Sequence, residues 1–184
     1  MPSKEDFSRA VSESVRSAFA TMLSMDLVED ESFDSSTAAA ELICNIGLAG
    51  ALEGSITLFF SNTGACAIVS AMLGMEIESV SPDVCDGMCE MVNVIAGGFK
   101  NRVSSLSCPF NLSLPTAVQG QLMHLSVTDG LEKVIRRFSC DKFSFDVELI
   151  YKLKPTPDVQ SPAPVVNKMS AFEKLKAMTA QVKN

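Results

Sequence analysis

Two side chains that could act together chemically are Glu90 and Asn93, which stand three residues apart. The surrounding apolar residues recur at three- and four-residue steps, which predicts a helix with one buried stripe. These apolar residues are Met88, Met91, Val92, Ile95 and Phe99. Residues three apart are neighbours on a helix surface, so we expect the carboxylate and the amide to point the same way. A side-chain amide can orient a water molecule without acting as a base. Taken alone, the pair also fits an ordinary solvated helix face, although asparagine is mildly unfavourable within a helix.

The helix that must carry this pair has recognisable ends in the sequence. Ser81-Pro82-Asp83 is typical of a helix start, because proline suits the first turn and an acid suits its positive end. We expect the helix to end in the polar run from Asn101 to Ser107. Gly97 and Gly98 lie inside it, where glycine is unfavourable, so they predict the close approach of another backbone.

The rest of the chain supplies alternating helix and strand patterns. We predict a first helix over residues 3–26, an acidic surface loop over 28–36 and a hairpin formed by 38–48 and 54–61. A second helix follows, capped by Asn62-Thr63 and stopped at Gly74. After the long third helix, we predict strands over 117–128, 133–140 and 143–154. This order predicts an α+β fold, with an antiparallel sheet covered by helices that include the long site-bearing one.

Composition excludes several classes of protein. The chain has 184 residues and a formal net charge of −7, with 47% hydrophobic residues, which fits one globular domain with short appendages. No basic stripe is present, so we expect neither nucleic acid nor an anionic membrane surface as a partner. The start lacks a secretory signal pattern, and the apolar stretch 42–52 is too short to span a membrane. We therefore expect a cytoplasmic protein.

The cysteines and the single histidine offer little for catalysis or metal binding. The six cysteines form no Cys-x-x-Cys pair. Cys85 and Cys89 share a helix face, but partners with zinc-type spacing are missing. We interpret the cysteines as reduced, small core residues. His124 is the one histidine of the sequence and leaves no general base for a Ser or Cys triad. No phosphate-binding glycine loop occurs, so no cofactor is expected for this chain itself.

The C-terminal region reads as an appendage to the domain over 1–154. Residues 155–167 contain four prolines and predict an extended linker. Residues 168–184 predict a short amphipathic helix or tail with a capping box from Ser170 to Glu173. Such a short helix is marginal alone in water, so it either packs on the domain, frays or serves as a tethered docking helix.

Four blocks in order give the chain a family resemblance. Asp86, Glu90, Asn93 and Pro115 match a pattern in which Glu-x-x-Asn follows an acid or serine and precedes a proline. Three longer segments also match that family pattern: GSITLFFSNTGACAIVSAMLGM, NVIAGGFKN and LSLPTAVQG. Over about residues 40–154 the chain resembles the CheC/CheX/FliY chemotaxis phosphatases, and most of all the CheX branch. The family usually has asparagine where Gly98 stands, so the helix surface after the site differs.

The resemblance implies a function and roles for named residues. It implies an aspartyl-phosphate phosphatase, a hydrolase that dephosphorylates a CheY-type response regulator in chemotaxis, a form of two-component signalling. Asn93 would hold the attacking water, and Glu90 would pair with a lysine of the receiver. Asp86 and Pro115 would support the site, although a first-turn acid and a turn proline are also common structural features. The magnesium ion would belong to the receiver. The resemblance also implies a homodimer with sheet edges joined across a two-fold axis.

Two other classes of function remain open from the sequence. The same fold could serve as a non-catalytic module that binds a receiver domain or a motor component without hydrolysing its phosphate. A metal-dependent or small-molecule enzyme is disfavoured by the missing histidines, glycine loop and cysteine pairs. Replacing Asn93 separates the phosphatase from the non-catalytic module, because only the phosphatase depends on the Asn93 amide.

Overall fold

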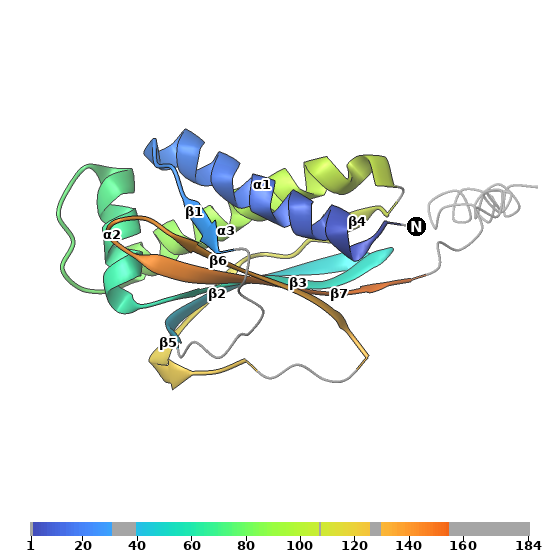
Figure 1. Cartoon of the computed structure of the whole chain (residues 1–184). Helices are drawn as coiled ribbons and strands as arrows, with labels where there is room; N and C mark the ends of the chain where they lie inside the picture. Colours follow the sequence, from blue (N-terminus) through green and yellow to red (C-terminus); the bar gives the residue numbers. More distant parts are fainter. Residues whose placement is uncertain (1, 31–39, 107, 126–129, 155–184) are drawn as a thin grey trace, which may run out of the picture.

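The structure is a computed structural model, and it describes residues 2–30, 40–106, 108–125 and 130–154. Within these ranges, three α-helices accompany a seven-stranded antiparallel sheet. Figure 1 shows α1 (Lys4–Leu23) and α3 (Pro82–Val103) side by side over one face of the sheet, with α2 (Asn62–Leu73) at one end. The α+β class expected from the sequence is confirmed. The proposed linker and tail lie outside the described residues.

The sheet has the strand order β1-β6-β7-β3-β2-β4, and β5 also pairs with β2. Its strands are β1 (Val28–Asp30), β2 (Ala40–Gly50), β3 (Leu52–Phe60), β4 (Phe110–Leu112), β5 (Thr116–Met123), β6 (Glu132–Ser139) and β7 (Ser144–Leu153). The expected hairpin is formed by β2 and β3, which turn at Ala51. β4 and β5 pair one after the other with the same edge of β2.

One expectation about the start of the chain is wrong. Val28–Asp30 is a strand rather than part of a loop, because it pairs antiparallel with β6. Its central residue, Glu29, forms ion pairs with Arg16 of α1 and Arg136 of β6. An acidic tripeptide has no strand signature of its own, and its partners come from distant parts of the chain. The rest of the predicted loop lies outside the described residues.

The region after the long helix also differs from expectation. The strand β4 was not predicted, because it has three residues and is too short to show a period. β5 ends at Met123, so the strand predicted over 117–128 is too long at residues 124 and 125, and 126–128 lie outside the described residues. The register of β5 against β2 shifts between Ala40 and Leu42, and Leu122 takes a left-handed φ of 49°. This irregularity breaks the alternation that the prediction relied on.

Local signals explain most helix ends. Ser3 and Asp6 form a capping box at the start of α1. α2 is capped by Ser61 rather than by Asn62-Thr63, because the Ser61 hydroxyl accepts the Gly64 amide. Gly74 ends α2 in the left-handed conformation, as expected for a glycine C-cap.

The core lies between the sheet and the helices. The five apolar residues predicted for the buried stripe of α3 are all fully buried. Phe99 of α3 contacts the ring of Phe7 on α1, with the centroids 6.1 Å apart, and that of Phe110 on β4, at 6.0 Å. This packing fixes the rotation of α3 about its axis, which decides what the opposite side of the helix presents to solvent.

Candidate functional site

The site helix α3 is positioned by the signals that its sequence predicts. Ser81 is the N-cap and accepts the Val84 amide at 3.4 Å, and Pro82 occupies the first turn. Asp83 lies near the positive end of the helix, and Lys100 and Arg102 lie in its last turn. The helix ends at Val103 and passes into a 3₁₀ turn over Ser104–Leu106, within the polar run where we expected the end.

Asp86, Glu90 and Asn93 form an exposed ridge on α3. All three residues are exposed, and they follow one another at steps of four and three residues, so they lie on one face. Met91 and Val92, between Glu90 and Asn93, are fully buried. The structure therefore brings the predicted Glu–Asn pair together on the surface, directly opposite the side that holds the core.

The geometry connects Asp86 and Pro115 to the Glu90–Asn93 pair less directly than a supporting role at the site would suggest. The N-cap is Ser81, so Asp86 lies one turn further into the helix than a capping residue. Among the described residues, no hydrogen bond joins Asp86 or Pro115 to Glu90 or Asn93. Asp86 does act on its own helix, because its charge is one cause of the raised pKa of Cys89, after burial.

Pro115 lies where the chain passes from β4 to β5 along the edge of β2. Just before it, the Ser113 hydroxyl accepts the Gly47 amide at 2.8 Å, and the Ser113 amide donates to the Gly47 carbonyl at 2.9 Å. Just after it, Thr116 pairs with Asn45. Since α3 packs on β2, β4 and β5, the proline is held on an edge that lies beside the site helix.

Three cysteines gather along the flank of α3. Burial, and then the proximity of Cys89 and Cys85, raises the pKa of the Cys44 thiol to about 12. The pKa of Cys89 is also raised, first by burial. The thiols of Cys44 and Cys89 therefore stay protonated near neutral pH and are poor nucleophiles. Spacing suggested the Cys85–Cys89 pair, but only the packing of α3 on β2 places Cys44 beside it.

The described part of the chain offers no metal site. No group of three or more His, Cys, Asp or Glu side chains is arranged to hold a metal ion within it. All six cysteines are free. The helices in the described ranges lack the combination of length and apolarity that a membrane span needs.

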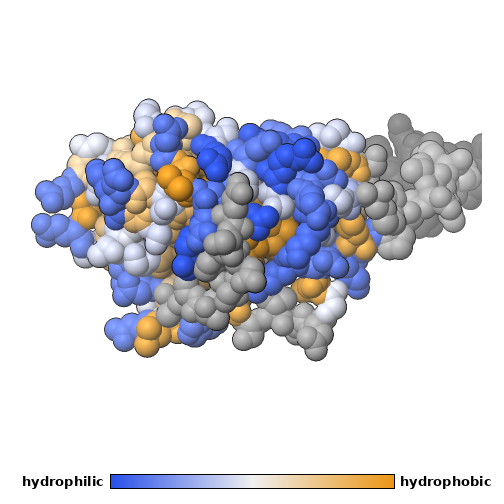
Figure 2. Space-filling view, viewed as in Figure 1, coloured by the Kyte–Doolittle hydropathy of each residue, from blue (hydrophilic) through white to orange (hydrophobic). Residues whose placement is uncertain are grey.

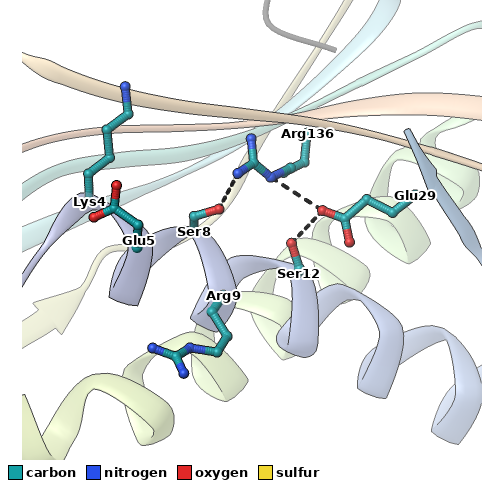
Figure 3. Close-up of a pocket in the computed structure, with 7 residues that line it drawn as sticks. All are labelled: Lys4, Glu5, Ser8, Arg9, Ser12, Glu29 and Arg136. Atoms are coloured by element: carbon teal, nitrogen blue, oxygen red, sulfur yellow. Dashed lines mark hydrogen bonds and ion pairs between the residues drawn. The ribbon is translucent and has the colours of Figure 1, made fainter. Parts of the chain in front are cut away.

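A hollow of about 480 Å³ lies away from the ridge, between α1, β1 and β6. Figure 3 shows that its central groups pair with one another: Arg136 contacts Ser8 and Glu29, and Ser12 donates to Glu29 at 2.6 Å. Figure 2 shows mostly hydrophilic side chains on this side of the molecule, with apolar residues scattered among them. The paired charges tie α1 to the sheet, so we assign this hollow a structural role.

The fold and the exposed Glu-x-x-Asn helix define a class, the CheC-like chemotaxis proteins. A crystal structure of a CheC-like superfamily protein from Shewanella sp. PV-4 superposes with a TM-score of 0.75 at 25% identity, covering 82% of this chain and 99% of that one. Within this class, the sequence model of the family described as chemotaxis phosphatase CheX matches residues 42–139. The chain belongs to the CheX family.

Two further relatives carry functional descriptions of their own. The CheY-P phosphatase CheX of Thermotoga maritima is 32% identical over 81 residues, which is 44% of this chain. The match spans about half of that relative, 52% of its length. A structure of the CheX-CheY-BeF3-Mg+2 complex from Borrelia burgdorferi contains a chain with the same fold, with a TM-score of 0.69 at 22% identity, covering 78% of this chain and 96% of that one.

Proposed function

We propose that this protein accelerates hydrolysis of the phospho-aspartate of a CheY-type receiver. The observation that carries the proposal is the exposed ridge of α3, which presents Glu90 and Asn93 together in a chain of the CheX family. The name of the Thermotoga relative and the receiver present in the Borrelia complex support the choice of substrate.

This chain needs to supply few chemical groups for the reaction. In the reaction, the oxygen of a water molecule attacks phosphorus, the bond to the aspartyl oxygen breaks, and the products are a free carboxylate and inorganic phosphate. Phosphoryl transfer depends mainly on positioning and on neutralisation of charge. The receiver supplies a magnesium ion and a lysine. Asn93 supplies an amide that orients the water in line with the breaking bond.

Glu90 acts in docking. It lies one helical turn before Asn93 on the same ridge, so a pairing with the receiver lysine fixes how the amide enters the receiver site. The negative charge of Glu90 belongs to a wider acidic region, because residues 62–99 contain five acidic residues and no lysine or arginine. They are Glu76, Glu78, Asp83, Asp86 and Glu90. Charge pairs at such an interface orient the partner and speed its encounter.

The experiment compares the lifetime of a phosphorylated CheY-type receiver with and without this protein. We expect faster phosphate release with the natural chain and a loss of roughly a hundredfold in that acceleration for Asn93→Ala, as when one positioned hydrogen-bonding group is removed from a site. Asn101→Ala is the matched control, because Asn101 is also exposed on α3, eight residues or about 12 Å further along.

The outcomes separate the competing readings. Binding of the receiver without faster phosphate loss would favour the non-catalytic module. Acceleration that survives Asn93→Ala would keep the activity and reject the proposed site. Equal losses for Asn93→Ala and Asn101→Ala would point to a general disturbance of α3, which thermal unfolding of both variants would show.

We further propose that the protein is a homodimer joined at the β5 edge. β5 pairs with β2 on one side, and the exposed fractions of Leu114, Val118 and Leu122 are 86%, 55% and 76%. Among the described strands none pairs with the other edge of β5, and an edge strand with exposed apolar residues is suited to pairing with another chain. Light scattering tests this: a monomeric mass at micromolar concentration, unchanged by Val118→Lys, would reject the dimer.

A cytoplasmic location fits the same proposal. Receivers and their phosphatases act together inside the cell, and free cysteines persist in reducing compartments. The six free thiols of this chain agree with that setting. Detection of a fluorescent fusion of the full chain at the cell envelope rather than throughout the cytoplasm would contradict it.

A further inference from the structure

We infer that Gly97 is a docking position, where α3 leaves its backbone uncovered so that the receiver can approach closely one turn beyond Asn93. This inference rests on the proposed function and assigns a further positioning residue to the same surface. The partner it fits is a convex segment of the receiver beside the phosphorylated aspartate.

Nothing inside the described molecule requires glycine at this position. A Cβ built on Gly97 meets no atom within 4 Å, and its φ is not in the left-handed region. Glycine within a helix is destabilising relative to alanine, because it adds conformational freedom to the unfolded chain. The close backbone approach that the sequence suggested is therefore not made at Gly97 within the described structure.

The neighbouring glycine shows the contrast. A Cβ on Gly98 would lie 3.4 Å from the Cβ of Ser14 on α1 and 3.2 Å from a guanidinium nitrogen of Arg102. That guanidinium donates to the Gly98 carbonyl at 3.2 Å and pairs with Glu13 of α1 at 3.3 Å. Gly98 thus serves the packing of α1 against α3, whereas Gly97 contributes to no such contact.

Gly97 continues the functional ridge. It follows Asn93 by four residues and Glu90 by seven, the steps that keep residues on one helix face. The ridge therefore consists of Asp86, Glu90 and Asn93, followed by a position without a side chain. A larger residue there would hinder the close approach of the receiver to α3 and would weaken the complex in which Asn93 reaches the receiver site.

The experiment measures two properties of Gly97→Ala and Gly97→Leu. The first is the affinity for a CheY-type receiver from the same organism, loaded with beryllofluoride and Mg²⁺. The second is the half-saturating concentration and maximal rate of phosphate loss from the phosphorylated receiver. Thermal unfolding of each variant is recorded alongside.

The expected results move in opposite directions. Gly97→Ala raises the unfolding midpoint by about 2 to 4 °C, because alanine favours the helix. Its receiver affinity falls about threefold, and that of Gly97→Leu falls about tenfold or more, as a clash grows with side-chain size. For Gly97→Ala the loss appears in the half-saturating concentration rather than in the maximal rate. A purely structural glycine would not give greater stability together with weaker docking.

Two controls define the specificity of the effect. Ala20→Leu adds an apolar side chain at an exposed position of α1, one turn after Arg16 and therefore on the flank that faces β1. It is expected to leave receiver affinity unchanged. Gly98→Ala is expected to raise the unfolding midpoint less than Gly97→Ala does, since the Arg102 side chain must shift to make room.

Each outcome decides one question. Natural affinity in both Gly97 variants would overturn this inference and leave the proposed function intact. A natural chain that binds the beryllofluoride receiver without speeding phosphate loss would overturn the phosphatase proposal, and the affinities of the same variants would still decide the role of Gly97. A natural chain that binds no receiver would overturn both.

Discussion

The two sides of α3 differ in what holds their residues in place. On one side, Met88, Val92 and Phe99 are fully buried against α1 and the sheet. Packing therefore restricts which side chains these positions can hold. Glu90 and Asn93 on the other side are exposed, and the described structure gives them no hydrogen-bonding partner. One helix therefore carries two separable tasks. Changes on the buried side should lower stability, and changes on the exposed side should lower receiver docking or hydrolysis.

The largest expected effect is a loss of stability from a substitution on the buried side of α3. Phe99→Ala removes a fully buried ring that contacts Phe7 and Phe110. We expect a loss of about 3 to 5 kcal/mol in the free energy of unfolding, from lost burial and the cavity left behind. Urea unfolding followed by circular dichroism measures it. Glu90→Ala is the control on the opposite side and should stay within about 0.5 kcal/mol of the natural chain.

The second effect tests the border between the two sides, where Cys44 meets Cys85 and Cys89. Burial raises the folded-state pKa of Cys44 from 9.0 to about 12, so the folded protein holds this proton more tightly than the unfolded chain. The resulting stability is fully present below pH 9 and is lost as the pH rises from 9 towards 12.

The measurement is the free energy of unfolding between pH 8 and pH 11 for the natural chain and for Cys44→Ala. The natural chain should lose about 1 kcal/mol per pH unit more than the variant above pH 9, since one pKa unit corresponds to about 1.4 kcal/mol. The difference between the two proteins removes the contribution of other groups that titrate in this range. Parallel curves would show that Cys44 ionises in the folded state as easily as in the unfolded one.

The smallest expected effect concerns the charge of Glu90 on the exposed side of α3. Glu90→Gln keeps the size of the side chain and removes its charge. We expect receiver affinity to fall about tenfold at low salt and less at high salt, because an exposed charge pair is screened by ions. Titration of the beryllofluoride-loaded receiver at two salt concentrations measures it. Glu78→Gln removes an exposed charge from the loop before α3 and provides the control; an equal fall in both variants would assign the effect to the general acidic field.

Much of this architecture could be read from local patterns. The limits of α3 follow from Ser81, Pro82 and the polar run after Lys100, and the period of its apolar residues correctly gave the buried side. Once that side is known, helical geometry alone places Glu90 and Asn93 together and outward. The pairing of β2 with β3 and the long β7 were equally readable, because alternation extends over their whole length.

The two strands that were not predicted, β1 and β4, form because of contacts with distant parts of the chain. β1 is three residues long and exists because β6 offers it a paired edge, with Glu29 held between Arg16 and Arg136. β4 is equally short and depends on the edge of β2. Neither segment has a period or a propensity strong enough to show without its partner.

The sequence by itself determined the helices, the longer strands, the antiparallel α+β class and the juxtaposition of Glu90 with Asn93, because each depends on interactions between residues close along the chain. Only the tertiary structure decided which of two adjacent glycines is packed. Gly98 faces Ser14 on α1 and Gly97 faces open space, and this follows from how α1 crosses α3. The same packing brought Cys44 beside Cys85 and Cys89 and set Pro115 on the edge of β2. Contacts between distant segments leave no local pattern, so they become visible only in the folded chain.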